Sequence, residues 1–173
     1  MSVLRADSRR DLEIHRYPVL MYALAPLAAL VLQAWLPRLV GRYAWFDLPL
    51  IITVYFALGR RSPIQGTVMG CLLGLLQDAL THHPIGVNGV AKTIVGFLAA
   101  SVGIRIDVEN HTIRLVLIFV LSLLSGALYI FVNRFLLGLP LDSDWLAEVY
   151  TSVINSVIAV VVFPFFDRFQ VRD

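Results

Sequence analysis

The residues from Gly66 to Ala100 read GTVMGCLLGLLQDALTHHPIGVNGVAKTIVGFLAA and decide how this chain folds. Two apolar runs flank the short polar segment THHPIGVN, so the stretch predicts two helices joined by a turn. Within both runs, small or polar residues recur at every fourth position: Gly66, Gly70, Gly74 and Asp78, then Asn88, Lys92, Gly96 and Ala100. Because residues four apart share one helix face, each helix is expected to carry one stripe of small and polar side chains.

Folding the second helix back antiparallel brings the two stripes together. Overlapping GxxxG spacing lets two helix backbones approach closely, so the glycines are predicted to be the packing surface. With the turn centred in the polar segment, the predicted facing pairs are Gly74 with Gly96, Gly70 with Ala100, and Asp78 with Lys92.

The Asp78–Lys92 pair has two interpretations at this stage. An unpaired charge at membrane depth costs roughly 2.5–3.5 kcal/mol on insertion scales, so in the first interpretation the pairing only locks the hairpin. Alternatively, the two residues mark a binding or proton-relay site, since charges inside membranes are often functional. In the turn, Pro84 and Gly86 favour a tight reversal, and Asn88 is predicted to cap the second helix.

The composition is that of an all-α integral membrane protein. Apolar residues form 58% of the 173-residue chain and charged residues 15%, against about half and a quarter in soluble domains. This length accommodates about six spans of roughly 20 residues, so a single membrane domain over 1–173 is expected. The polar segment 1–16 precedes an apolar run without a small-residue cleavage site, which favours a retained first span over a signal peptide.

Six spans are predicted, over residues 17–36, 47–59, 64–80, 87–104, 113–137 and 145–166. Pro37 is expected to close the first span, in which Ala25 and Ala29 form a small-residue pair that suits helix packing. Asp47 is placed to cap the short second span, with Pro49 in its first turn. Near the ends of the last two spans, Arg134 and Glu148 are predicted to form a rim ion pair.

The arginines predict the orientation. Six spans place both ends of the chain on one side, together with ten arginines, whereas only Arg38, Arg42 and Arg134 lie on the other side. By the positive-inside rule, the segments 1–16 and 167–173 are then cytoplasmic.

No motif for catalysis or cofactor binding is present. The chain lacks a nucleophile elbow, a phosphate-binding glycine loop and an HExxH zinc motif. Asp78 and His82 have spacing compatible with metal binding, but no second pair of ligands accompanies them. The lone Cys71 excludes an internal disulfide. A non-enzymatic protein without metal or cofactor is therefore expected.

Three segments resemble the MreD family of bacterial rod shape-determining proteins: FDLPLIITVYFALGRRSPIQG (46–66), GCLLGLLQDAL (70–80) and PIGVNGVAKTIVGFLA (84–99). The resemblance implies an inner-membrane scaffold that binds the bitopic protein MreC. With MreC, it would couple cytoplasmic MreB filaments to the peptidoglycan synthase RodA and its class B penicillin-binding protein. The protein would be surrounded by membrane lipid and would not bind nucleic acid.

The implied fold is similar to the compact six-helix substrate-binding subunits of energy-coupling-factor transporters. This similarity provides an alternative function, namely binding a vitamin for such a transporter. The Ala25 and Ala29 pair is of the kind that such subunits use to dock their partner. No rich polar and aromatic pocket is expected from the sequence, which argues against this alternative.

Overall fold

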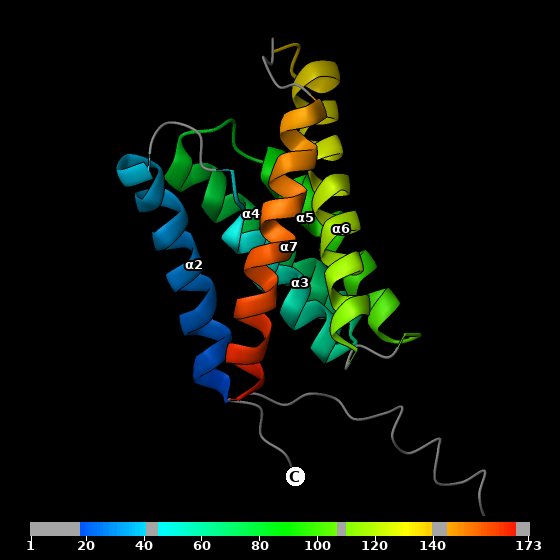
Figure 1. Ribbon diagram of the computed structural model, residues 1–173. Helices are drawn as coiled ribbons and strands as arrows, with labels where there is room; N and C mark the ends of the chain where they lie inside the picture. Colours follow the sequence, from blue (N-terminus) through cyan, green and yellow to red (C-terminus); the bar gives the residue numbers. More distant parts are fainter. Residues whose placement is uncertain (1–17, 41–44, 107–109, 140–144, 169–173) are drawn as a thin grey trace, which may run out of the picture.

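The computed structural model describes residues 18–40, 45–106, 110–139 and 145–168 (Figure 1). These residues form six α-helices and one π-helical segment, without a strand: α2 (Val19–Val40), α3 (Leu48–Arg60), α4 (Pro63–Thr81), α5 (Val87–Gly103), α6 (His111–Phe131), η1 (Val132–Leu136) and α7 (Trp145–Asp167). The all-α fold and its six predicted helical segments are thereby confirmed. The segment 1–16, predicted to be cytoplasmic, lies outside the described residues, as does the tail beyond residue 168.

One predicted boundary is wrong. Pro37 does not close the first helix, because α2 continues to Val40. A proline removes one backbone hydrogen bond, whereas leaving the helix in an apolar environment would leave several backbone groups unpaired. Continuing the helix is therefore the less costly outcome.

Helix α3 forms the centre of the bundle. Eleven of its residues, Pro49 to Gly59, are buried, and it contacts α2, α4, α5, α6 and α7. In Figure 1 it lies between α2 and α6, with α7 crossing in front of it. A helix that is hydrophobic on all sides is a core helix. Its thirteen residues span only about 20 Å, and its position inside the bundle explains why so short an apolar segment suffices.

Helices α4 and α5 form the predicted antiparallel hairpin. A Cβ atom on Gly70 would overlap the carbonyl group of Lys92, and one on Gly96 would overlap that of Gly66. The glycines therefore permit direct backbone contact, as predicted, and Ala100 is buried beside them.

The predicted register of this hairpin is wrong by two helical turns. Gly66 faces Gly96 and Gly70 faces Lys92, whereas Gly74 faces Asn88 rather than Gly96. This shift moves α5 by eight residues, or about 12 Å, along α4. Its physical reason is the carboxylate of Asp78, which binds the first backbone N–H groups of α5 and so brings the start of that helix alongside the last turns of α4.

Two helices of the described chain are long and apolar enough to cross a membrane. They are the continuous segment 111–136, which joins α6 and η1, and α7. The apolar helices 20–36, 48–60 and 87–103 are shorter. Large apolar side chains are exposed on the outside of the bundle, among them Leu24, Leu27, Leu72, Val116, Val120, Val157 and Val161. Exposed apolar surface of this extent indicates contact with lipid or with partner helices.

The bundle has two ends of different character. At the terminal end, where α2 begins and α7 finishes, the rings of Tyr55, Phe56, Phe163 and Phe166 cluster around the C-terminal half of α3. Asp167 accepts hydrogen bonds there from the Tyr55 hydroxyl (2.8 Å) and from Arg114 (2.6 Å). The opposite end, here called the distal end, holds the α4–α5 turn, η1 and the start of α7 (Figure 1).

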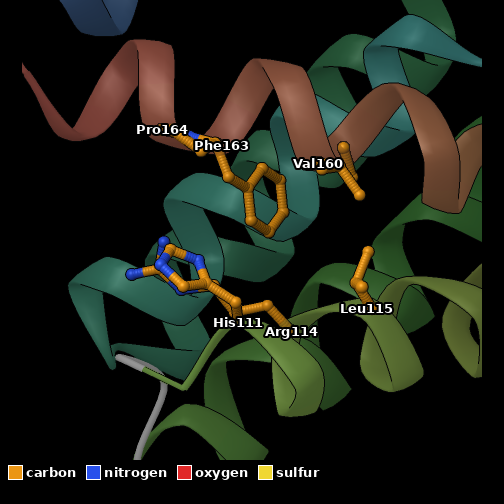
Figure 2. Close-up of a pocket in the computed structure, with 7 residues that line it drawn as sticks. His111, Arg114, Leu115, Val160, Phe163 and Pro164 are labelled. Carbon is orange, nitrogen blue, oxygen red and sulfur yellow. The ribbon is translucent and has the colours of Figure 1, made fainter.

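A small pocket lies between α6 and α7 at the terminal end. Its volume is about 240 Å³. Figure 2 shows His111 and Arg114 on one side of it, with Phe163 and Val160 of α7 facing them. Most of the residues that line this pocket are apolar. The guanidinium of Arg114, which also lines it, is already paired with Asp167.

Candidate functional site

The polar residues of the distal end converge on Lys92. Its side chain is fully buried, and Nζ lies 2.6 Å from Oδ2 of Asp47 and 3.0 Å from Oδ1 of Asn88. The predicted pairing of Lys92 with Asp78 is therefore wrong. The two-turn shift of α5 moves Lys92 away from Asp78 and towards the beginning of α3, where Asp47 lies.

Asp78 caps helix α5 instead. Its buried carboxylate accepts hydrogen bonds from the backbone N–H groups of Gly86 (2.9 Å), Asn88 (3.1 Å) and Gly89 (3.3 Å). A helix N-terminus favours negative charge and has unpaired N–H groups, so the carboxylate is compensated without a cation. The prediction that Asn88 caps α5 is wrong, because the N-cap is Gly86 and its cap comes from α4.

The turn between α4 and α5 needs its glycine. Gly86 has a φ of 104°, a backbone conformation that residues with a Cβ atom rarely adopt. Pro84 accepts a hydrogen bond from the backbone N–H of Val87 at 3.4 Å. The predicted tight turn is thus confirmed.

The amide of Asn88 connects the two acidic residues. Its Nδ2 donates to Asp78 at 2.7 Å, and its Oδ1 accepts from Lys92. The result is a continuous chain of contacts from Asp78 through Asn88 and Lys92 to Asp47. Each charged group in it has an opposite charge or a set of N–H donors, as buried charges require.

Asp47 extends this chain to other helices. It caps α3 by accepting from the Leu50 N–H at 3.1 Å, as predicted. Its own N–H donates to Asn155 of α7 at 2.8 Å, and the Asn155 amide donates to Ser122 of α6 at 2.7 Å. The polar network therefore joins α3, α4, α5, α6 and α7.

Gln33 is a member of the site that sequence reasoning missed. Its amide donates to the Phe46 carbonyl and accepts from the Leu48 N–H, both at 3.0 Å. These bonds tie α2 to the segment that leads into α3. The sequence signal that could have revealed it is a single glutamine within an apolar run, because a buried amide needs hydrogen-bond partners.

A polar cavity of about 210 Å³ lies beside this network at the distal end. All six α-helices contribute to its walls, and its lining includes Gln33, Asp47, Gln77, His83, Asn88, Ser122, Ser125, Tyr129, Glu148, Thr151 and Asn155. The sequence predicted no rich polar and aromatic pocket, so this polar cavity is a feature that it did not reveal. Its polar residues come from five helices, from the N-cap of α3 and from the α4–α5 turn, so no single stretch of sequence displays them.

The predicted ion pair between Arg134 and Glu148 is also wrong. Arg134 is exposed in η1, and the two residues form no salt bridge in the described structure. The Glu148 carboxylate packs instead against Gly126 of α6, where any Cβ would overlap it. The absence of a side chain at Gly126 leaves room for Glu148 to turn inward, towards the cavity.

The remaining predicted residues have ordinary packing roles. Ala29 is buried in the core and Ala25 is half-buried against it, so this pair packs within the bundle. His82 is exposed at the end of α4, whereas His83 contacts the ring of Tyr129. Across the described ranges, no three His, Cys, Asp or Glu residues gather in a way that could hold a metal ion.

The arrangement defines the class of protein: an all-helical membrane protein whose buried charges are paired and tie its helices together. Two helices are long and apolar enough to cross a membrane, and large apolar side chains are exposed on the outside of the bundle. Both features support the assignment to the membrane. A family model described as rod shape-determining protein MreD matches residues 14–171 of the 173, and the chain belongs to this family. Membership assigns it a role in rod shape determination, in a family of shape-determining structural proteins. No curated protein and no solved structure matches the chain significantly.

Proposed function

We propose that the protein is a non-enzymatic scaffold of the bacterial elongation complex. In this role it binds MreC and helps couple MreB filaments to peptidoglycan synthesis by RodA and a class B penicillin-binding protein. The observation that carries the proposal is the family match over almost the whole chain. The paired charges of the distal end support the proposal, because they tie the helices together and so favour a rigid bundle to which partners can bind.

The proposed topology has six membrane-spanning helices and both ends in the cytoplasm of an inner membrane. The position of the α2 start and the α7 end on one side of the bundle supports it (Figure 1). The core position of α3 supports counting this short helix as a span, because the other helices shield it. The distal end, with the polar network and the cavity, then faces the outer side of the membrane.

The exposed apolar faces of the bundle supply the surface for MreC. Trp145 and Tyr150 are exposed at the start of α7, and the Tyr150 ring contacts Trp45 edge to face at 6.1 Å. Aromatic side chains at the end of a membrane-spanning helix suit the membrane–water interface and the anchoring of a partner helix.

Photocrosslinking tests this binding. A photoreactive residue is placed in turn at Leu27 on α2, Leu72 on α4 and Val157 on α7, all exposed apolar positions, and MreC is sought among the crosslinked products. Crosslinks confined to one helix face support the scaffold. The absence of MreC crosslinks from every face, together with its absence after affinity purification from native membranes, contradicts it.

One observation favours the alternative of a vitamin-binding transporter subunit. This is the polar cavity at the distal end, in the place where the outer side of the membrane is proposed. However, Ala25 and Ala29 are packed inside the bundle and do not offer a docking surface. The volume of about 210 Å³ is also below the roughly 300–1,000 Å³ of pockets for drug-sized ligands. Recovery of an ATPase-driven transporter module in the same purification would support this alternative.

A further inference from the structure

The distal cavity contains one acidic group without a counter-charge. Two acidic residues of this end are compensated, Asp47 by Lys92 and Asp78 by the N-terminus of α5. Glu148 is half-buried and lines the cavity, and in the described chain it has no salt bridge. Asp47 is the other acidic lining residue, and among the described residues that line the cavity His83 is the one basic side chain. The His83 imidazole is engaged with the Thr81 hydroxyl at 3.2 Å.

A second, independent observation points into the same cavity. Gln77 of α4 is 7% exposed and lines the cavity, and its Oε1 has no hydrogen-bond partner. Buried acceptors are nearly always paired in native proteins, so this atom marks a place where a donor belongs. A carboxylate and an unpaired amide oxygen in one cavity both call for a group that is cationic and rich in N–H donors.

The rest of the lining suits the same group. Ser125, Tyr129 and Thr151 add hydroxyl groups that can accept hydrogen bonds. A primary ammonium has three donors and no acceptor, which matches this set. A metal ion is less well served, because no cluster of three His, Cys, Asp or Glu residues occurs in the described ranges. The small volume limits the occupant to a small molecule or to the headgroup of a larger one.

We propose that the distal cavity binds a primary ammonium group, with the Glu148 carboxylate as its counter-ion and Gln77 Oε1 as a hydrogen-bond acceptor. The group belongs either to a small free amine or to the ethanolamine headgroup of a membrane phospholipid. This proposal does not depend on the scaffold function.

The first experiment uses simple amines on the purified full-length chain in phosphatidylglycerol nanodiscs. Ethylammonium chloride is expected to raise the unfolding temperature with a saturable concentration dependence. Tetramethylammonium chloride at equal ionic strength is expected to leave it unchanged, because it carries the charge without N–H donors. Equal effects of the two salts, or no effect of ethylammonium, overturn the proposal.

Variants test the named residues. Glu148→Gln keeps the shape of the side chain without its charge, and we expect it to weaken ethylammonium binding at least tenfold. Gln77→Met removes the unpaired acceptor, and we expect a several-fold loss. Gln65→Met is the matched control, since Gln65 is exposed on the same helix outside this cavity, and its binding should equal that of the unaltered chain. Unchanged binding in both Glu148→Gln and Gln77→Met contradicts the site. If Glu148→Gln does not fold, Gln77→Met and the comparison of the two salts still decide.

Native mass spectrometry distinguishes the two sources. The protein is released from nanodiscs that contain phosphatidylethanolamine and phosphatidylglycerol in equal amounts. Retention of phosphatidylethanolamine that is lost in Gln77→Met identifies the lipid headgroup. Ethylammonium binding without such retention identifies a free amine. If neither phosphatidylethanolamine nor ethylammonium binds, the proposal is wrong, whether or not MreC binds the bundle.

Discussion

The two ends of helix α3 hold the bundle together in different ways. At its N-terminus, Asp47 is engaged in directional bonds to Lys92 and Asn155, inside a polar network. Around its C-terminal half, Tyr55 and Phe56 pack against other aromatic rings, and the Tyr55 hydroxyl donates a hydrogen bond to the partly exposed Asp167. Packing between rings is lost gradually, whereas removing one member of a buried charge pair leaves its partner uncompensated. The distal end should therefore respond far more sharply to substitution than the terminal end.

The largest effect is expected for Lys92→Met. It leaves the Asp47 carboxylate without a cation, and breaking a buried pair in this way costs about 3–5 kcal/mol of unfolding free energy. Unfolding of the purified protein in mixed detergent micelles measures the loss. The double variant D47N/K92M should recover part of the stability, because it removes both charges, whereas D78N/K92M should recover less. If D47N/K92M loses as much as the two single variants together, the two residues are not coupled.

The next largest loss of unfolding free energy is expected at the contact between α4 and α5, the two helices that also carry part of the polar network. Gly70→Ala places a methyl group against the Lys92 carbonyl, so the two backbones must separate, at a cost of about 1–3 kcal/mol. Gly89→Ala is the matched control, because there the new methyl meets the end of the flexible Leu75 side chain, which can move. The same unfolding assay should show a clearly smaller loss for Gly89→Ala. Equal losses in both variants would be evidence against the tight backbone contact at Gly70.

At the terminal end, Phe163→Leu is expected to cost about 1 kcal/mol, because the change keeps most of the buried apolar volume. Phe163 is 3% exposed and packs on the ring of Tyr55, with centroids 4.9 Å apart. Unfolding free energy measures the effect, with Phe165→Leu as an exposed control on the same helix. A loss as large as that of Lys92→Met would contradict the difference between the two ends.

The smallest effects are expected at charged residues near the rims. Asp167→Asn removes the charge opposite Arg114 but leaves an amide oxygen that can still accept its hydrogen bond, so we expect a loss of about 1 kcal/mol. Arg134→Ala should be neutral within about 0.5 kcal/mol, because Arg134 is exposed and does not pair with Glu148. A loss above this range for Arg134→Ala would be evidence for the ion pair with Glu148 that the sequence predicted.

Several features of the fold were predictable because they depend on residues close together in the chain. Asp47 followed by Pro49 is a local capping pattern, and α3 begins at Leu48 as expected. The glycines at four-residue spacing form one face of α4 in any helix, so their contact with α5 followed from helix geometry. The six helical segments and the family resemblance rest on the same kind of local information, and the family is confirmed.

The sequence by itself thus determined the class of the protein, its helices and several of the residues that face inward, among them Asp78 and Lys92. Only the tertiary structure decided which inward residues meet. Asp78 could be compensated by Lys92 or by the N–H groups of a helix start, and the register of α5 followed from the second choice. Lys92 was then left to Asp47, 45 residues away, and Glu148 was turned into a cavity by the space at Gly126. Partner choice among buried charges is a property of the whole bundle, because each group takes the best-placed partner that packing leaves available.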